Sequence, residues 1–388
     1  MSKFVNFAIL TNRNGGVAVA NVLTKRVSLV ELFYDLVFVY MISRATELLH
    51  HLHHGVLTPV TLVIFFLVII VFINSWMVQM VFTNRYGKSS WTNIIFSFID
   101  MAIILYMSNA FTATFDQHLA TFFIAAGLLS MTLCLQYLIT YFQVQKEIDK
   151  KITIAFTGIL GFRTVVLFAG GFYYNPVGIT VALAGIIISW LAPAFTGRYT
   201  HHHPIIFSHI LERLTALIIV MFGETIVGIA NYFTQENLAW SSVFIFIVVV
   251  GLFFTYIVEF DHLIDEHRKQ ETGNLLIYLH YFIIFGLSLA TVALKFINEP
   301  EANVIFAITV LYLGVILFYI GLAIADYYNQ PQLHVGWPVR LVFTSTTIIG
   351  YVLVLIFNQL NVIALVTAVV IVMNAVVLVK FLINRIGE

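Results

Sequence analysis

Long apolar segments make up most of the chain, and short clusters of turn residues, prolines and charges separate them. A helix needs about 20 predominantly apolar residues to cross the hydrocarbon core of a membrane. The pattern predicts twelve such helices, with the ranges 28–49, 56–82, 91–114, 118–143, 152–174, 176–195, 205–232, 239–260, 274–297, 302–327, 338–358 and 362–383. We therefore expect an all-α, polytopic membrane bundle. The longest hydrophilic stretch, Glu259–Gly273, is too short for a soluble domain.

Composition excludes an ordinary soluble protein. The chain has 388 residues, of which 61% are hydrophobic and 10% are charged, whereas about a quarter of a typical soluble chain is charged. The net charge is zero, so no binding of nucleic acid is expected. The lone cysteine, Cys134, lies in an apolar run and supports neither a disulfide nor a thiolate metal site. The N-terminal stretch has no convincing cleavage site and is not interpreted as a removed signal peptide.

The distribution of basic residues predicts the orientation. With the N-terminus in the cytoplasm, fifteen of the 19 lysines and arginines fall on the cytoplasmic side and only Lys295 on the other, and Arg44, Arg163 and Arg213 lie within helices. Loops that stay in the cytoplasm carry such an excess of basic residues. An even number of helices then places both termini in the cytoplasm.

The two halves of the chain are similar in outline. Laying Ser28–Glu31 over His209–Glu212 also places Asn93 over Asn274. Six helices in each half would make the repeats parallel, related by an axis along the membrane normal. The predicted organisation is a cytoplasmic segment followed by two halves of one membrane domain, with the ranges 1–27, 28–196 and 205–384.

The first predicted helix contains four ionisable side chains: Glu31, Asp35, Arg44 and Glu47. A charge at the centre of a membrane helix costs roughly 2.5–3.5 kcal/mol even on lenient scales, so four need a polar interior. Glu31 and Asp35 share one helix face, whereas Arg44 lies on the side opposite Asp35 and must have other neighbours. Two close carboxylates favour a proton or a cation between them. The pattern indicates a proton- or cation-handling site, and a structural charge network is the alternative.

The seventh predicted helix carries a second group of ionisable residues. His209 is spaced for local pairing with Glu212 and Arg213. Glu224 lies eleven residues after Arg213, on nearly the same face and about 16 Å further along the helix. We expect Arg213 and Glu224 to line one side of a shared cavity, and we interpret Glu224 as a functional residue.

Glycines accompany Glu224. Gly223 is its neighbour in the chain, and Gly228 lies one turn further on. We expect both to let a neighbouring helix or a file of water approach closely.

Three further ionisable residues lie in the middle of other predicted helices: Asp100, Arg163 and His280. An unpaired charge in the bundle costs more than a pair, so we expect some of the acids to pair with Arg44, Arg163 or Arg213 across helices. His280 can titrate near neutral pH and serve as a proton relay or sensor. A histidine that is simply hydrogen-bonded in the core is the alternative.

Catalytic and metal-binding patterns are absent from the sequence. It contains no Walker-type glycine loop, no H-E-x-x-H and no G-x-S-x-G. We therefore expect no catalytic residues and no cofactor. Two histidine clusters, residues 50–54 and residues 201–203, lack carboxylates or cysteines at supportive spacing and lie on opposite predicted sides. They are expected to be solvated rather than to bind metal.

Three segments resemble signatures of the bacterial low temperature requirement protein A (LtrA) family. They are VELFYDLVFVYMISRATELL, HILERLTALIIVMFGETIVGI and YLHYFIIFGLSLATVALK, and the resemblance extends from about Lys25 to Asn384. Tyr34 stands where the family often has phenylalanine, and Arg44 and Glu47 stand where many relatives are uncharged. The positions that match the family's motifs are Glu31, Phe33, Asp35, His209, Glu212, Arg213, Gly223, Glu224 and His280.

This resemblance implies a multi-pass protein of the bacterial plasma membrane that is linked to growth at low temperature. A weaker similarity around Arg26, Phe33, Tyr34 and Asp35 is to potassium/proton channels built from two six-helix repeats. The leading hypothesis is a transporter or channel whose partners are the lipid bilayer and protons, monovalent cations or a small solute. A membrane enzyme or lipid-binding protein acting in envelope adaptation to cold is the alternative. A purely structural or signalling role, and assembly into a homo-oligomer, also stay open.

Overall fold

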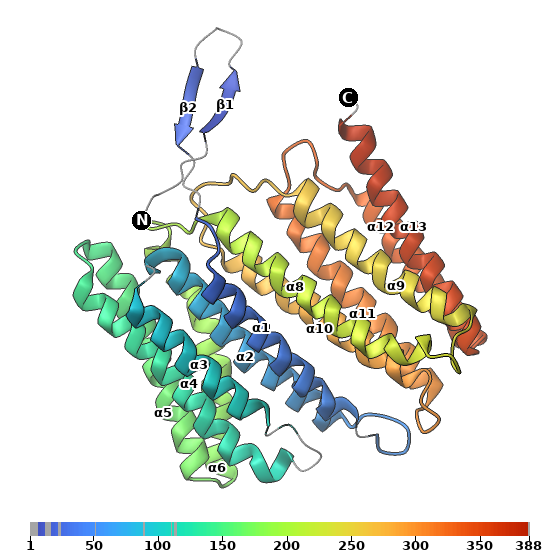
Figure 1. Ribbon diagram of the computed structural model, residues 1–388, viewed down its shortest axis with the longest axis horizontal. Coiled ribbons are helices and arrows are strands. Elements are labelled where there is room, and N and C mark those ends of the chain that lie inside the picture. The colour runs from blue at the N-terminus through green and yellow to red at the C-terminus, as the bar shows by residue number, and fades with distance from the viewer. Residues whose placement is uncertain are drawn as a thin grey trace.

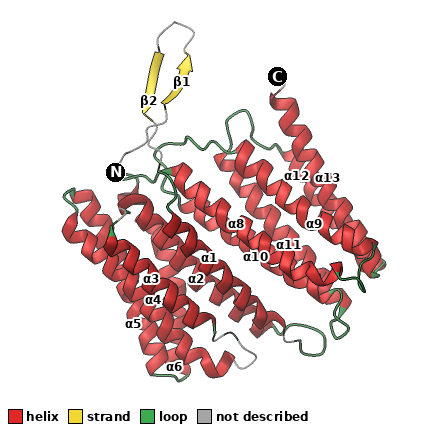
Figure 2. Cartoon of the chain, viewed as in Figure 1, coloured by secondary structure: helices red, strands yellow, loops and turns green. Residues whose placement is uncertain are grey.

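The computed structural model describes residues 7–11, 17–21, 25–50, 52–87, 90–109, 111 and 115–386. Nearly all of this part of the chain is helical (Figures 1 and 2). The helices are α1 (Leu29–Thr46), α2 (Pro59–Tyr86), α3 (Trp91–Ser108), α4 (Phe115–Gln143), α5 (Glu147–Phe172), α6 (Pro176–Leu191), α7 (Gly197–Thr200), α8 (Phe207–Ile229), α9 (Trp240–Ile257), α10 (Asn274–Phe296), α11 (Val304–Ala325), α12 (Trp337–Ile356) and α13 (Leu360–Ile386).

One antiparallel hairpin precedes the bundle. It consists of β1 (Phe7–Thr11) and β2 (Val17–Asn21), and Phe7 pairs with Asn21. The hairpin projects from one end of the bundle, and the end of α13 lies at that same end (Figure 1).

The predicted polytopic helical bundle is confirmed. Eleven helices of the described chain are long and apolar enough to cross a membrane. To these the structure adds α1, which carries Glu31, Asp35 and Arg44 within 18 residues. Each of the twelve predicted segments overlaps one long helix. The prediction that both termini are cytoplasmic stays a prediction.

Helix α1 buries Glu31 and Asp35 on one face. Its other face is apolar and exposed, at Leu29, Leu32, Phe33, Leu36 and Tyr40, and this spacing follows the helical period. The polar face turns toward the bundle interior, the arrangement expected of a membrane helix with ionisable residues.

The helices form two groups that lie side by side, α1–α6 and α8–α13 (Figure 1). In the first group α1 packs on α2 and α3, and α3 packs on α4; in the second, α8 packs on α9 and α10, and α10 packs on α11. The groups meet where α1 and α2 contact α8 and where α2 contacts α10. The same order of neighbours thus occurs in both groups, and the division into parallel repeats stays a prediction.

Close backbone approach holds part of the second group together. A Cβ atom on Gly286 of α10 would lie 2.6 Å from the carbonyl oxygen of Gly314 of α11, and one on Gly314 would meet the Gly286 carbonyl at 2.6 Å. Small residues at such crossings let membrane helices pack by van der Waals contact, since lipid provides no hydrophobic drive between helices.

Candidate functional site

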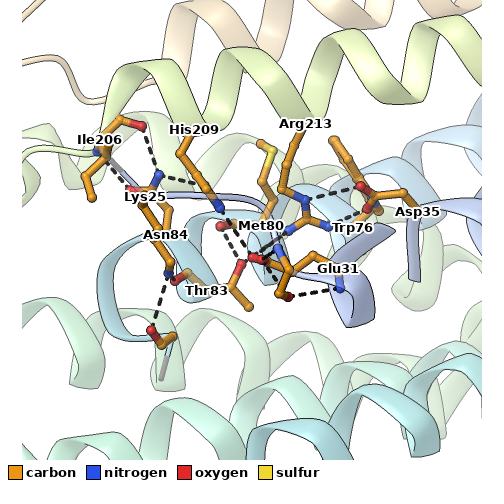
Figure 3. A network of polar contacts seen from close by, with 12 residues as sticks. Lys25, Glu31, Asp35, Trp76, Met80, Thr83, Asn84, Ile206, His209 and Arg213 are labelled. Carbon is orange, nitrogen blue, oxygen red and sulfur yellow. Dashed lines mark hydrogen bonds and ion pairs between the residues drawn. The ribbon is translucent and has the colours of Figure 1, made fainter. Parts of the chain in front are cut away.

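The centre of the site is an ion pair between the two helix groups. Asp35 of α1 and Arg213 of α8 are 2% and 0% exposed. The guanidinium binds both carboxylate oxygens, Oδ1 through Nη2 and Oδ2 through Nε at 3.3 Å (Figure 3). Such a bidentate pair is stronger and more directional than a single contact. The predicted pairing of acids and arginines across helices is confirmed at this position.

Trp76 of α2 completes the surroundings of this pair. Its Nε1–H donates to Asp35 Oδ1 at 2.6 Å, and the Arg213 guanidinium lies 5.4 Å from the centre of its ring. The indole therefore acts both as a hydrogen-bond donor to the acid and as a cation–π partner of the base. Three helices are joined at one buried point.

Glu31 shares the same arginine. Its Oε1 lies 3.6 Å from Arg213 Nη1 and 3.5 Å from His209 Nε2. Its Oε2 accepts from the backbone N–H and the hydroxyl of Ser28, each at 2.9 Å. The Ser28 hydroxyl in turn accepts from the Glu31 N–H, which forms a capping box at the start of α1. The predicted common face of Glu31 and Asp35 is thus used to hold one guanidinium.

Asn84 of α2 determines the protonation pattern of His209. Its Oδ1 accepts from the Ile206 N–H and its Nδ2 donates to the Ile206 carbonyl, both at 2.9 Å. The same Nδ2 lies 3.1 Å from His209 Nδ1, so Nδ1 must be the acceptor. The imidazole then carries its proton on Nε2, facing Glu31 (Figure 3).

Lys25 adds a second base at the end of the network. Its Nζ donates to the carbonyl oxygens of Thr83 and Gly87, the latter at 3.3 Å, at the C-terminus of α2. A cation there is favoured by the helix dipole. Burial lowers the pKa of Lys25, and the charge of Glu31 opposes that shift. Thr83 also accepts from Arg213 Nη1 at 3.2 Å.

A cavity of about 120 Å³ reaches this end of the network. It lies where α1 and α3 begin and α2 ends. Its lining combines the network residues Lys25, Glu31 and Thr83 with polar neighbours that include Arg26, Ser28, Asn93 and Ser97. Asp35 and Arg213 are not part of this lining. Glu31 is therefore the network acid that borders open space, and Asp35 lies in the closed interior.

Arg163 is satisfied without an acid. This side chain of α5 is 1% exposed and donates to Asn74 Oδ1 at 2.5 Å, Ser75 Oγ at 2.6 Å and the Val71 carbonyl at 3.1 Å, all on α2. The expected acidic partner for Arg163 is not found in the described chain, so that prediction is wrong. Within the described ranges Arg44 also has no acid from another helix; it pairs with Glu47 three residues along.

Asp100 of α3 lies within a second buried polar region. It is 0% exposed, its Oδ1 accepts from Thr132 of α4, and its Oδ2 has no hydrogen-bond partner. Unpartnered buried polar atoms also occur at Tyr34 of α1, Gln79 of α2 and Gln136 of α4. Tyr34 is next to Asp35 in the chain, and Gln79 lies one turn from Trp76 and from Thr83. The polar region thus adjoins the ion pair.

Glu212 does not belong to the network. Its side chain is exposed, whereas His209 and Arg213 turn inward on either side of it along α8. The expected local pairing of His209 with Glu212 is therefore wrong. The angle of 100° per residue places Glu212 on a different face from Arg213.

Glu224 lies at the other end of α8 and is only partly buried. Lys295 of α10 packs against the next turn of α8, where a Cβ atom on Gly228 would be 2.9 Å from Lys295 Cε. Thr225 and Thr291 join the two helices there by a hydrogen bond of 2.7 Å. The predicted close approach holds at Gly228, whereas a Cβ atom on Gly223 would meet nothing within 4 Å.

His280 of α10 is hydrogen-bonded through both ring nitrogens. Nδ1 lies 2.6 Å from the Leu276 carbonyl and Nε2 lies 3.4 Å from the Tyr256 hydroxyl. The ring is 0% exposed and packs 5.0 Å from the Phe260 ring. Nδ1 is therefore the donor and Nε2 the acceptor, an arrangement that suits a core histidine.

Comparison with known proteins identifies the family. The family model of the bacterial low temperature requirement A protein (LtrA) matches residues 26–375. The chain belongs to the LtrA family. No curated protein matches it at a significant level. The matched LtrA region contains every network residue except Lys25, and it spans both helix groups, so the ion pair between α1 and α8 lies wholly within it.

Proposed function

We propose that this LtrA-family protein transports protons or monovalent cations across the bacterial plasma membrane, and that the network of Glu31, Asp35, His209 and Arg213 gates that movement. The observation that carries the proposal is that one buried guanidinium is shared by two acids from the opposite helix group. The inner acid is closed off, and the outer acid borders a cavity.

Gating follows from competition for Arg213. A proton or a cation that reaches Glu31 through the cavity weakens its attraction to Arg213 Nη1, which lies 3.6 Å away. Because Arg213 binds Asp35 at the same time, any change at Glu31 alters the contact between α1 and α8. A proton or a cation at Glu31 also weakens the attraction of this carboxylate to His209, whose Nε2 lies 3.5 Å from it. The arrangement couples occupancy at the cavity to the interface between the two groups.

The equal numbers of acids and bases in the network support a gate that responds to the arrival of one proton or cation. Two acids, Glu31 and Asp35, lie near two bases, Arg213 and Lys25. One extra proton makes the group positive in a region where charge is costly. In this proposal the contacts of Arg213 with both acids belong to the closed gate.

A polar route into the bundle continues from the gate. The unpartnered atoms of Tyr34, Gln79, Asp100 and Gln136 need water or an ion, because buried polar groups are almost always hydrogen-bonded. Glu224 is a partly buried acid near the other end of α8, and Lys295 packs against Gly228 one turn further along. We infer that the path begins within the first helix group, since the unpartnered atoms belong to α1–α4, and that the two groups act as parallel halves.

Flux measurements on the purified protein test the proposal. Proteoliposomes with the wild type should show proton, potassium or sodium flux under an imposed gradient and voltage. Asp35→Asn, Glu31→Gln and Glu224→Gln should each change that flux at least severalfold. Glu212→Gln is the matched control, since it removes one acid of the same helix from an exposed position. Folded wild-type protein without any such flux would refute the transport function.

A second result separates gating from mere structure. If the network is purely structural, Asp35→Asn lowers thermal stability and leaves any flux per folded molecule unchanged. Flux should therefore be normalised to the folded fraction in each preparation.

A further inference from the structure

A second cavity, of about 250 Å³, lies between α11 and α12 in the other helix group. Its deep wall carries Glu259, Tyr319 and Thr347, and Phe343 supplies an apolar side. Ile316, Ile320 and Ile348 line it as well and are 41%, 39% and 54% exposed. Since these three residues belong to membrane-spanning helices, this side of the cavity faces lipid.

Glu259 reaches this cavity because the chain departs from α-helical geometry. The end of α9 continues as a π-helical turn, Val258–Leu263, before the chain leaves the bundle. Such turns are rare and are often found at functional sites. Glu259 is 2% exposed within the turn, whereas the hydropathy pattern placed it at the start of a hydrophilic loop. That expectation is corrected here: the loop begins after Leu263.

The carboxyl group of Glu259 has spare binding capacity. Among the described residues, its Oε1 has no hydrogen-bond partner. The hydroxyl of Tyr319, which is 9% exposed, lies within hydrogen-bonding reach of Asn374 and can still accept a hydrogen bond. Asn329 lies within hydrogen-bonding reach of the carboxyl group, and Arg340 and Asp326 are its charged neighbours. A buried acid without a partner is costly unless a proton, a cation or a donor meets it.

Arg340 does not neutralise Glu259. It donates to Asp326 Oδ2 at 2.7 Å, and Asp326 also accepts from the Val335 N–H at 2.6 Å and lies 3.6 Å from His334. The arginine is thereby committed to the other acid of the cavity. With two acids and one arginine, the cavity favours a positively charged guest.

We propose that this cavity binds a single-tailed amphiphile with a primary ammonium headgroup. The ammonium donates to Glu259 Oε1 and to the Tyr319 hydroxyl, and the tail leaves past Phe343 and Ile320 into the lipid. Pockets for drug-sized ligands measure about 300–1,000 Å³, so a cavity of this size holds a headgroup and the start of a chain. This inference does not depend on the transport proposal.

The test uses the full chain in lipid nanodiscs and three probes with the same tail. Dodecylamine should bind saturably by native mass spectrometry, and it should bind at least tenfold more tightly than dodecanol or dodecanoate. Glu259→Gln should weaken amine binding by roughly tenfold to a hundredfold, because a hydrogen bond to a charged group is lost. Asp261→Asn is the matched control, since that acid lies two residues away with its side chain 74% exposed.

If Glu259→Gln fails to fold, a variant at the opening of the cavity still tests the proposal. Ile320→Trp fills the opening from an exposed position and should abolish amine binding with Glu259 intact. Equal affinity for the amine and the alcohol, or unchanged amine binding in Glu259→Gln or in Ile320→Trp, would overturn the proposal. Displacement of bound amine by zwitterionic phospholipid alone would also overturn it, by assigning the cavity to ordinary lipid.

Discussion

The strongest thermodynamic consequence of the network concerns the pair Asp35–Arg213, and a double-mutant cycle measures it. Removing one partner of a buried ion pair costs about 3–5 kcal/mol, because an uncompensated charge is left behind. Asp35→Asn keeps the shape of the side chain and leaves Arg213 near Glu31 at 3.6 Å. That remaining acid relieves part of the penalty, so we expect a loss of about 2–4 kcal/mol.

Arg213→Gln should be the more damaging single change. It leaves Glu31 and Asp35 together on one face of α1 with no guanidinium between them. We expect a loss near the upper end, about 4–5 kcal/mol. The double variant removes both charges of the pair and leaves Glu31 with Lys25. Its cost should be about 1–3 kcal/mol smaller than the sum of the single costs.

Equilibrium unfolding in mixed detergent micelles gives the three free energies. Glu212→Gln serves as the control, because an exposed acid on the same helix should change the free energy of unfolding by no more than about 0.5 kcal/mol. Additive single losses, each within about 1 kcal/mol of the control, would show that the pair is not the buried, water-excluded contact described above.

Two further predictions follow from the other bases. Arg163→Met should change the free energy of unfolding by no more than about 1–2 kcal/mol, because the desolvation cost of an arginine without an acid disappears while Asn74 and Ser75 lose a donor. A loss as large as that expected for Arg213→Gln would contradict this balance. NMR of labelled lysine should place the pKa of Lys25 below its ordinary value of about 10.4, since burial lowers that pKa. The variant Glu31→Gln should lower the pKa of Lys25 further, because the charge of Glu31 opposes the effect of burial. The folded state then binds fewer protons than the unfolded state, so the contribution of Lys25 to stability rises with pH between the two pKa values; an unshifted resonance would contradict its burial.

The order of the helices was predictable because bilayer thickness dictates segment length. Twelve apolar segments, cut by turns such as Asn175-Pro176, correspond to twelve long helices. The charged face of α1 was also predictable, since Glu31 and Asp35 recur at the helical period. The partner of each charge was not, because it depends on how each helix is rotated against its neighbours. Arg213 meets Asp35, whereas Arg163 turns toward the amide of Asn74.

Several residues of the site had signals that are easy to overlook. Trp76 in an apolar helix suggests ordinary core packing, yet its N–H binds Asp35. Thr83 and Asn84 end a helix that is otherwise strongly apolar, and Asn84 sets the orientation of His209. Glu259 was assigned to a loop because no periodicity in sequence reveals a π-helical turn. In each case the sequence does not show how one helical turn is wound or which way its side chains point.

The network at Arg213 and the cavity at Glu259 differ in their access to lipid and in their balance of charges. The network at Arg213 is closed and balanced in charge, so it stabilises one arrangement of α1 against α8. The cavity at Glu259 is open to lipid and has an excess of acid. An opening of the α1–α8 contact needs movement between the helix groups, whereas α11 and α12 can bind a guest within one group. Because the two centres lie in different contacts, loss of amine binding in Glu259→Gln should leave the Asp35–Arg213 coupling energy unchanged.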